Sequence, residues 1–356
     1  MVHFKLLLEN DFIRIKKIIK VCLWVNKTGV TTMISRTILN NQLQFTLKET
    51  NYPQLGKKIA GKVRDNYIQD DRRIIIATDR LSAFDHIITT IPFKGQVLTE
   101  MANFWFKNTK NIVRNHILDE PDPNVVVTQE CTTIPLEIVV RGYITGVTTT
   151  SAWYNYQQGV RNLCGNILPE GMQKDEKLPE PIITPTTKPT NGEHDKNISP
   201  KDAITQQLVT KDQMDELTEL AFALFKKGNE IASKQGIILV DTKYEFGLLD
   251  NNIVLIDEIH TPDSSRFWFA DTYQERFDKG EEQRKIDKEY LRTWLANKGY
   301  RGEGTIPTIP DEIKVETAQK YIQAYELITG QKFNAISGDL KERMETNLRK
   351  AGYLID

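Results

Sequence analysis

Apolar residues recur along this chain at two spacings, and each spacing predicts a different kind of element. The run RRIIIATD, at residues 72–79, is apolar and β-branched and ends in polar residues, which is typical of a buried strand. The run IPLEIVVRGYI, at residues 134–144, has the same character. From residue 45 to about residue 91 short strands alternate with turns, so the N-terminal part is expected to be rich in β-structure.

Four segments instead have the 3.6-residue spacing of amphipathic helices. The strongest signal lies at residues 210–236, where Thr210 and Gln213 have the spacing of a capping box and Gly236 suits a C-cap. Other helices are predicted at residues 98–117, 281–298 and 315–329, with a short one in residues 151–160 and one near the C-terminus. Prolines interrupt any regular pattern between residues 163 and 203, so a long loop is predicted there.

This order of elements predicts a mixed α/β protein with a β-rich N-terminal lobe, a larger α/β lobe and a helical tail. The expected divisions are residues 1–34, 35–138, 139–280 and 281–356. The first of these contains FIRIKKIIKVCLWV, whose lysines interrupt the apolar core that a signal peptide needs. A weak organellar or membrane-surface role is one interpretation. A loosely constrained extension, or an over-long reading frame whose working start is Met33, is the preferred one.

Composition narrows the classes of function. The 356 residues are 39% hydrophobic and 27% charged, which supplies a core and argues against global disorder. A formal net charge of −1 lacks the basic excess of a nucleic-acid binder. No apolar run approaches the roughly 18–20 residues that span a membrane. The cysteines, at positions 22, 131 and 164, form no CxxC pair, which favours a reducing, cytoplasmic compartment over a disulfide scaffold or a zinc site.

The segment IILVDTKYEFGLLDNNIVLIDEI predicts a hairpin that carries two carboxylates. Residues 250–252 supply the turn, because asparagine tolerates the left-handed conformation of such loops. If all three form the loop, Leu249 pairs with Ile253. Side chains alternate between faces from there, so Glu245 lies opposite Asp257.

Two facing carboxylates repel each other, so this register predicts a cation beside them. Lys243 lies on the same face as Glu245 and Asp257. A Mg²⁺ ion shared with the phosphates of a nucleotide would satisfy the pair. An ion pair with Lys243 or an arginine, without any metal, would also satisfy it.

Two further segments could bind anions. In IAGKVRDNY, Gly61 precedes Lys62 and Arg64, and a glycine lets the backbone approach a phosphate that the cations neutralise. The GxxxxGK[ST] spacing of a P-loop is absent, and an ordinary exposed turn is the alternative. In IVVRGYITG, Arg141 follows an apolar run as either an anion ligand or half of an internal salt bridge.

Polar residues also collect after the strand RRIIIA and within the proline-rich segment. Strand ends favour ligand sites in α/β proteins, and the His-Asp pair at residues 194–195 suggests general-base chemistry. A capped turn and a plain surface loop are the respective alternatives. The candidates are Asp79, Ser82 and Asp85 in TDRLSAFD, and Thr187, Lys188, His194 and Asp195 in TPTTKPTNGEHD.

Together these motifs resemble one family, the phosphoribosylaminoimidazole-succinocarboxamide synthases (SAICAR synthetases) of purine biosynthesis. The similar segments are GKVRDNY, TDRLSAFD, PLEIVVRGYITG, ITPTTK with EHDKNIS, LVDTKYEFG and IDEIHTPDSSRFW, in family order from about residue 44 to residue 334. The resemblance implies a two-lobed fold related to ATP-grasp enzymes. It also implies an ATP-dependent C–N ligase that joins L-aspartate to the carboxylate of carboxyaminoimidazole ribotide (CAIR).

The resemblance further implies a role for each candidate. ATP and Mg²⁺ are the implied cofactors, and the implied partners are small-molecule substrates, with no nucleic acid or membrane and with a monomer or small homo-oligomer. ATP phosphates would bind Gly61, Lys62 and Arg64; Mg²⁺ would bind Glu245 and Asp257; the ribotide would bind Arg141, Lys243, Asp263, Ser264 and Arg266; and TDRLSAFD would line the same cleft. Lys188 and Asp195 would close over the substrate, and His194, Asp195 and Lys243 are the catalytic candidates.

One position departs from the family pattern. Val147 stands where many members have a serine after TG, so Thr148 is the candidate for the phosphate-binding hydroxyl.

Two other functions compete with this assignment. The first is an ATP-dependent kinase or ligase on a related fold with another phosphorylated substrate, which the VVRGY and SSR segments disfavour. The second is a non-catalytic nucleotide-binding protein, which would be expected to lack a metal ligand or Lys62.

Overall fold

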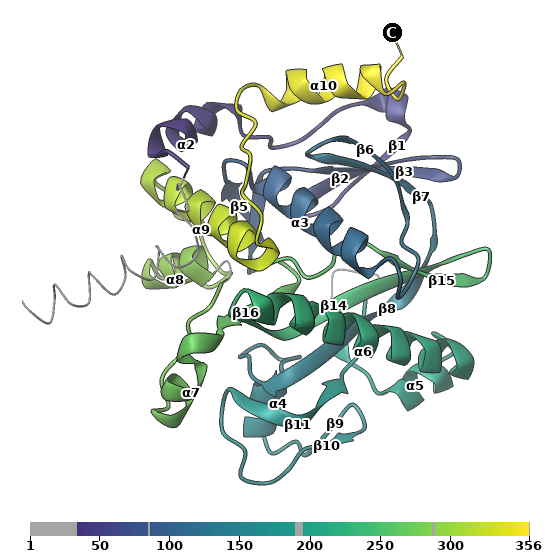
Figure 1. Cartoon of the computed structure of the whole chain (residues 1–356), viewed down its shortest axis with the longest axis vertical. Coiled ribbons are helices and arrows are strands. Elements are labelled where there is room, and N and C mark those ends of the chain that lie inside the picture. Colours follow the sequence, from purple (N-terminus) through teal and green to yellow (C-terminus); the bar gives the residue numbers. More distant parts are fainter. Residues whose placement is uncertain (1–33, 85, 189–194, 287–288, 356) are drawn as a thin grey trace, which may run out of the picture. The chain divides into compact units, whose positions relative to one another are not determined.

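The structure is a computed structural model that describes residues 34–84, 86–188, 195–286 and 289–355. Its internal contacts divide the chain into residues 1–35 and residues 36–356, and the second unit carries every element described here (Figure 1). The predictions for residues 1–33, for Asp85 and for His194 lie outside the described residues. Within the described residues, no helix is both long and apolar enough to cross a bilayer.

The N-terminal part is rich in β-structure, as predicted. Five antiparallel strands form one sheet in the order β1-β2-β3-β7-β6, and β4 pairs separately with β5. The strands are β1 (Lys57–Ala60), β2 (Arg64–Gln69), β3 (Arg72–Ala77), β4 (Arg80–Ala83), β5 (His86–Thr90), β6 (Ile117–Asp122) and β7 (Val125–Gln129). The turn between β1 and β2 holds the glycine segment.

A second sheet forms the middle of the protein. Its order is β13-β12-β8-β14-β15, with β11 added on β8 and β16 on β14. The strands are β8 (Thr132–Ile144), β11 (Glu176–Ile183), β12 (Thr186–Thr187), β13 (Lys196–Asn197), β14 (Ile237–Leu249), β15 (Asn252–Ile256) and β16 (Ser265–Phe269). The sheets change at residues 130–131, so the division expected at residue 138 falls inside β8.

The predicted register of the β14–β15 hairpin is wrong by one residue. Leu249 pairs with Asn252, and Glu245 pairs with Ile256. The turn is therefore only Asp250 and Asn251, whose φ angles of 51° and 63° are those of a two-residue left-handed turn. A two-residue turn with two positive φ angles suits the right-handed twist of the flanking strands better than a three-residue loop does.

The helices agree with the sequence pattern at their centres and differ at their ends. They are α2 (Arg36–Gln42), α3 (Lys94–Thr109), α4 (Ala152–Gln157), α5 (Pro200–Thr205), α6 (Lys211–Lys234), α7 (Ala270–Asp278), α8 (Glu289–Asn297), α9 (Asp311–Thr329) and α10 (Leu340–Lys350), with short 3₁₀ turns at Leu43–Phe45 and Pro53–Leu55. The capping box at Thr210 and Gln213 is confirmed.

Two helix predictions were too long. The helix expected at residues 98–117 begins at Lys94 and ends at Thr109, and Ile117 instead begins β6. The helix expected at residues 281–298 is shorter, because Lys285 forms a β-bridge with Trp268 before α8 begins. In both places a strand pairing formed by distant residues replaces the local helical pattern.

The predicted long loop contains more structure than expected. Besides β11, the short strands β9 (Asn162–Leu163) and β10 (Asn166–Ile167) pair within it. Strand β11 contains Pro179 and Pro181, which cannot donate to a ladder. Its register on β8 shifts between Lys177 and Ile182, so both prolines lie in the irregular part.

The tail helices return to the N-terminal part of the protein (Figure 1). Helix α9 packs on α3 and on α6, and α10 packs on β6. Leu340, Met344 and Leu348 of α10 join the buried cluster that includes Tyr67 and Ile76. Helix α6 covers β14. The tail is therefore part of the core around the N-terminal sheet.

Candidate active site

Two cavities lie side by side along β14. The first, of about 400 Å³, is named the glycine-turn cavity and lies between the β1–β2 turn and the ends of β14 and β15. The second, of about 800 Å³, is named the arginine cavity and lies along β8, β14 and the start of β16. Lys243 of β14 lines both of them.

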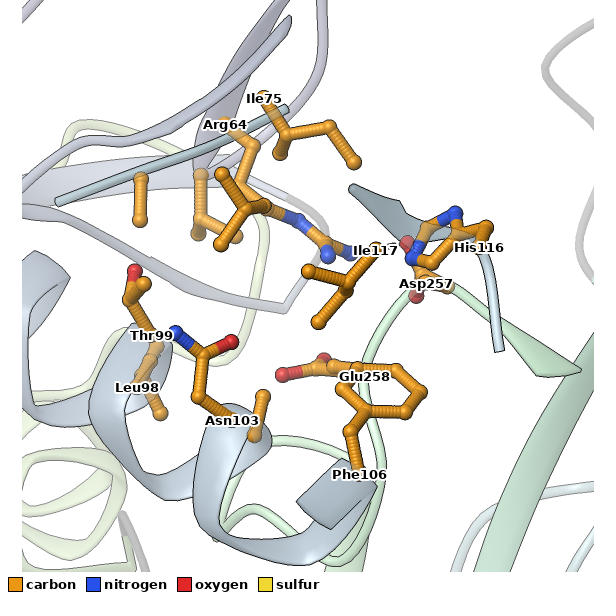
Figure 2. A pocket seen from close by; sticks show the side chains of 14 residues that line it. Arg64, Ile75, Leu98, Thr99, Asn103, Phe106, His116, Ile117, Asp257 and Glu258 are labelled. Carbon is orange, nitrogen blue, oxygen red and sulfur yellow. Dashed lines mark ion pairs between the residues drawn. The ribbon is translucent and has the colours of Figure 1, made fainter. Parts of the chain in front are cut away.

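An ion pair links the two sheets across the glycine-turn cavity. Arg64 of β2 reaches Asp257, with 2.5 Å between Nη2 and Oδ1. Burial alone would raise the pKa of Asp257, but the Arg64 guanidinium holds it at about 2. Figure 2 shows Arg64 pointing toward Asp257, while Glu258 lies on the side of the pocket where Asn103 and Phe106 of α3 are. The cavity behind this pair has only about 30 Å³, room for about one water molecule.

Glu245 and Asp257 lie close together despite the shifted register. Asp257 has a φ of 69°, so the strand alternation ends there, and both residues line the glycine-turn cavity. Glu245 forms ion pairs with Lys188 and, at 3.6 Å, with Lys243. Burial, followed by the charge of Asp257, raises the pKa of Glu245, and the two lysines act against this. The two lysines therefore offset only part of the cost of burying the charge of Glu245 near Asp257.

The ion-pair alternative expected from the sequence is present, and the same residues fit a metal in part. Among the described residues, no group of three or more His, Cys, Asp or Glu side chains is arranged to hold a metal ion. Mg²⁺ is commonly held by one or two carboxylates together with substrate phosphates. Glu245 and Asp257, which both line the glycine-turn cavity, supply two carboxylates of that donor set.

Arg80 holds the glycine turn in place. Its guanidinium donates to the carbonyl oxygens of Gly61 at 2.9 Å and Lys62 at 3.0 Å, and to Asp65 at 2.8 Å. The side chain is only 6% exposed, so these bonds are shielded from water. Arg80 is in the TDRLSAFD segment, but its role as a support for the turn was not predicted.

The arginine cavity is built around a buried carboxylate that was not predicted. Asp241 accepts from Arg266 through both carboxylate oxygens, with 2.8 Å from Nε to Oδ1, and from Nη1 of Arg141 at 3.4 Å. Arg141 also donates to Thr184 and to the carbonyl oxygen of Thr150. Burial lowers the pKa of Arg141 to about 10, against the effect of Asp241, so the arginine stays charged near neutral pH.

A tight turn with two hydroxyl groups forms the rim of the arginine cavity. Gly146 has a φ of 94°, and a Cβ atom there would lie 2.3 Å from Nη1 of Arg266. Only glycine therefore lets the guanidinium lie against this turn. Val147 is 74% exposed, whereas the hydroxyl groups of Thr148 and Ser151 lie 2.7 Å apart at the cavity. The predicted hydroxyl of Thr148 is present, and Ser151 is a second one that the sequence reasoning missed.

Several predicted residues lie elsewhere than expected. Asp79 is fully buried, and its carboxylate accepts from the backbone N–H groups of Leu47 and Gly95, so it supports the fold and does not line either cavity. Thr187 does not line the arginine cavity. Its neighbour Thr186 lines the cavity instead, because side chains alternate along β12.

The remaining predicted residues divide between the two cavities, with the exception of Ser82. Ser82 is half-buried in β4 and lines neither cavity. Gly61, Lys62 and Lys188 line the glycine-turn cavity, and Asp195, Asp263 and Ser264 line the arginine cavity.

Lys243 connects the two cavities electrostatically. Its Nζ lies 2.5 Å from Glu137 and 3.6 Å from Glu245. Burial opposes the charge, but these carboxylates raise the pKa of Lys243 above its ordinary range. Lys243 is therefore protonated near neutral pH and suits charge stabilisation, not the role of a general base.

A buried histidine fixes the loop that carries Asp257 and Asp263. His260 has a φ of 50° and is fully buried, with its Nε2 atom 2.6 Å from the hydroxyl of Tyr244. Burial lowers the pKa of His260 to about 3, so the ring is neutral near pH 7. A non-glycine residue in this conformation is strained, and such strain persists only where surrounding contacts determine the geometry. No pattern in the sequence indicates this role.

Comparison with known proteins finds one matching family model and several similar relatives. Residues 57–307 match the family model for SAICAR synthetase. The phosphoribosylaminoimidazole-succinocarboxamide synthase of Legionella pneumophila strain Paris is 48% identical over 313 residues, which cover 86% of this chain and 99% of that protein. A chloroplastic synthase of Arabidopsis thaliana is 46% identical over 331 residues, covering 92% of this chain and 80% of that protein.

Two solved structures are also similar. The SAICAR synthase of Saccharomyces cerevisiae, complexed with SAICAR, has a TM-score of 0.71 and 38% identity and covers 81% of this chain and 100% of that one. A SAICAR synthetase in complex with ADP has a TM-score of 0.58 and 26% identity and covers 78% of this chain and 100% of that one.

Proposed function

Because this chain belongs to the SAICAR synthetase family, we propose that it joins L-aspartate to the carboxylate of CAIR with cleavage of ATP to ADP and phosphate, giving SAICAR. The observation that carries the proposal is the position of Lys243, a protonated lysine that lines both cavities. A reaction that moves a phosphoryl group between two bound substrates needs such a cation where they meet. Relatives solved in complex with SAICAR and with ADP support a ribotide and a nucleotide as the two ligands.

The nucleotide is assigned to the glycine-turn cavity. Gly61 allows a phosphate to approach the backbone, and Lys62 and Arg64 supply positive charge beside it. Glu245 and Asp257 would hold Mg²⁺, which would neutralise the phosphate charge that develops during transfer. Arg80 keeps the turn in position through its bonds to the carbonyl oxygens of Gly61 and Lys62.

The ribotide is assigned to the arginine cavity. Arg266 is oriented by both oxygens of Asp241, and the Thr148 and Ser151 hydroxyl groups lie beside it. Guanidinium and hydroxyl groups together bind the oxygens of a phosphate well. With its phosphate at this rim, the ribotide extends along β14 toward Lys243, where its carboxylate would lie near the nucleotide.

The chemistry divides into two steps. An oxygen of the CAIR carboxylate attacks the γ-phosphorus of ATP, the bond to ADP breaks, and an acyl phosphate forms. The amine of L-aspartate then attacks the acyl carbon, phosphate leaves with the carboxylate oxygen, and the amine gives up a proton. Positioning and charge neutralisation carry the first step. Among the residues that the structure describes, Asp195, which lines the arginine cavity, is the candidate that would accept this proton.

The test is a coupled assay of ADP release with ATP and magnesium. We expect sustained release only when CAIR and L-aspartate are both present, with SAICAR formed in equal amount. Equal release with another phosphorylated acceptor would support the rival kinase or ligase, and no release under any condition would support a non-catalytic nucleotide-binding protein. A cytoplasmic location and a monomer or small homo-oligomer stay predictions.

A further inference from the structure

We propose that Lys94 and Tyr321 position Asp263 for binding of the ribotide, and that helix α9 is thereby part of the substrate site. The inference rests on the proposed function, because it takes the arginine cavity as the ribotide site. Helix α9 begins at Asp311, beyond residue 307, where the match to the family model ends. Among the described residues that line the cavity, neither Lys94 nor Tyr321 is included. None of the motifs found in the sequence contains either residue, so no motif assigns them this role.

Lys94 is a charged side chain in a place that opposes charge. It is 0% exposed and is the first residue of α3, where the helix dipole disfavours a cation. An ammonium group at such a site needs a close carboxylate partner. Its Nζ atom lies 3.0 Å from Oδ2 of Asp263. Burial raises the pKa of Asp79 to about 6, and the charge of Lys94 acts against this.

Tyr321 completes the cluster from α9. Its hydroxyl donates to Oδ1 of Asp263 at 2.8 Å, and its ring centroid lies 5.3 Å from Nζ of Lys94. An ammonium group over a tyrosine ring is attracted by it. Helix α3, the loop after β15 and helix α9 thus meet at one carboxylate, and each oxygen of that carboxylate is held by a different helix.

The cluster determines what Asp263 presents to the cavity. The Asp263 side chain is 10% exposed and lies beside Ser264 and Arg266 at the cavity wall. A carboxylate oxygen has a second lone pair, so Asp263 can accept from a ribose hydroxyl while Lys94 and Tyr321 hold it. The ribotide carries a negative phosphate and a negative carboxylate. Without a cation beside it, the Asp263 carboxylate would repel both groups, and Lys94 offsets the negative charge of Asp263 next to the ligand.

Tyr321→Phe is the sharpest variant, because it removes one hydroxyl group and keeps the ring. Tyr325→Phe is its matched control: Tyr325 lies one turn later on α9, is 5% exposed, and its hydroxyl donates to Gln331 at 3.2 Å. We expect the Kd for CAIR of Tyr321→Phe to rise about tenfold. The Kd for ATP and kcat at saturating CAIR should stay within about twofold, and the control should match the wild type in all three.

Lys94→Met should have a larger effect, because it leaves Asp263 charged beside the negative ligand. The expected loss in kcat/KM for CAIR is about a hundredfold. In an Asp263→Asn background the same change should cost much less, since the repulsion is already absent. If Lys94→Met does not fold, the tyrosine pair still decides the matter.

Three results would overturn the inference: equal Kd values for CAIR in Tyr321→Phe and Tyr325→Phe, equal changes in CAIR and ATP affinity in Tyr321→Phe, or additive effects of Lys94→Met and Asp263→Asn. An inactive wild-type protein would instead contradict the proposed function. An active wild type with a silent Tyr321→Phe contradicts this inference alone.

Discussion

The two cavities hold their charged side chains in different ways. In the arginine cavity, Asp241 and Arg266 come from the neighbouring strands β14 and β16 of one sheet, and Asp241 is 4% exposed. In the glycine-turn cavity, Arg64 comes from the other sheet and Asp257 from the loop after β15, and each side chain is 23% exposed. The first pair is built into a single sheet and its carboxylate is shielded from solvent, although Arg266 is 28% exposed, whereas the second pair joins two sheets and its carboxylate is reached by solvent.

This difference indicates how each ligand would be received. A guanidinium already fixed by a buried carboxylate loses little freedom when a phosphate binds, so the arginine cavity is preorganised. In the glycine-turn cavity the carboxylate itself is reached by solvent, so this pair can exchange partners: Asp257 can turn to a metal ion while Arg64 turns to a phosphate. We therefore expect variants in the glycine-turn cavity to change ATP binding and variants in the arginine cavity to change CAIR binding.

The largest effect is expected from Asp257→Asn and Glu245→Gln. Each change removes one of the two carboxylates that would hold Mg²⁺, so turnover should fall by about a thousandfold or more while the fold is kept. ADP release and thermal unfolding of the purified variants measure the two properties. Wild-type turnover in either variant would contradict the metal role, and loss of the fold would favour the purely structural ion pair.

Arg266→Ala should weaken CAIR binding by roughly ten- to a hundredfold, because a charge-assisted hydrogen bond contributes about 1.5–3 kcal/mol. ATP affinity should change little, and lysine should restore only part of the loss, since it lacks the planar fork. Arg64→Ala is the matched variant on the other side and should weaken ATP while leaving CAIR nearly unchanged. Separate titrations of both ligands decide the assignment, and a reversed pattern would mean that the cavities have been exchanged.

Acid should destabilise the folded protein through His116, which lines the glycine-turn cavity. Burial lowers the pKa of His116 to about 3, with Asp257 opposing and Arg64 assisting. Between pH 6.5 and 3 the unfolded chain binds a proton that the folded chain does not, so the free energy of unfolding falls as the pH falls. The contribution of His116 to the free energy of unfolding is therefore about 2 kcal/mol less favourable at pH 5 than at pH 7.

Urea unfolding at pH 7 and pH 5 measures the change in the free energy of unfolding, for the wild type and for His116→Asn. The variant should lose about 2 kcal/mol less than the wild type over this range. Burial raises the pKa of Asp79 to about 6, which stabilises the fold as the pH falls, but Asp79 is present in both proteins and cancels. The arginine cavity has no histidine among its described lining residues. Equal losses in both proteins would show that His116 does not carry the effect.

The smallest effect is expected from deletion of residues 1–34. Every described residue that lines either cavity lies beyond residue 60, and the match to the family model begins at residue 57. Activity and melting temperature should both stay nearly unchanged. A drop of several degrees in the melting temperature would show that this segment packs on the rest of the protein.

The sequence predicted the site best where chemistry follows a strand's period. Glu245 and Lys243 share a face of β14, and extending the same alternation back by two residues reaches Asp241, which could have been found this way. The pairing of Glu245 with Asp257 was predicted from a wrong register. The two carboxylates still meet because the left-handed conformation of Asp257 ends the alternation, which no periodic pattern contains.

Residues that act across long sequence separations could not be predicted. Lys94 and Asp263 are 169 positions apart, and a lysine at the start of an amphipathic helix gives no sign that it is fully buried. Tyr321 lies on a helix whose sequence pattern only indicates packing. Both roles depend on the way α3 and α9 pack together, which is a property of the whole fold.

The central claim is that a phosphoryl group passes from ATP to the CAIR carboxylate where the two cavities meet at Lys243. CAIR labelled with ¹⁸O in that carboxylate tests it most directly, because the acyl phosphate would carry one of the two carboxylate oxygens into the phosphate that leaves. Mass spectrometry of the phosphate released during turnover with ATP, magnesium and L-aspartate should show one ¹⁸O atom per phosphate. Unlabelled phosphate, formed together with SAICAR, would contradict the account.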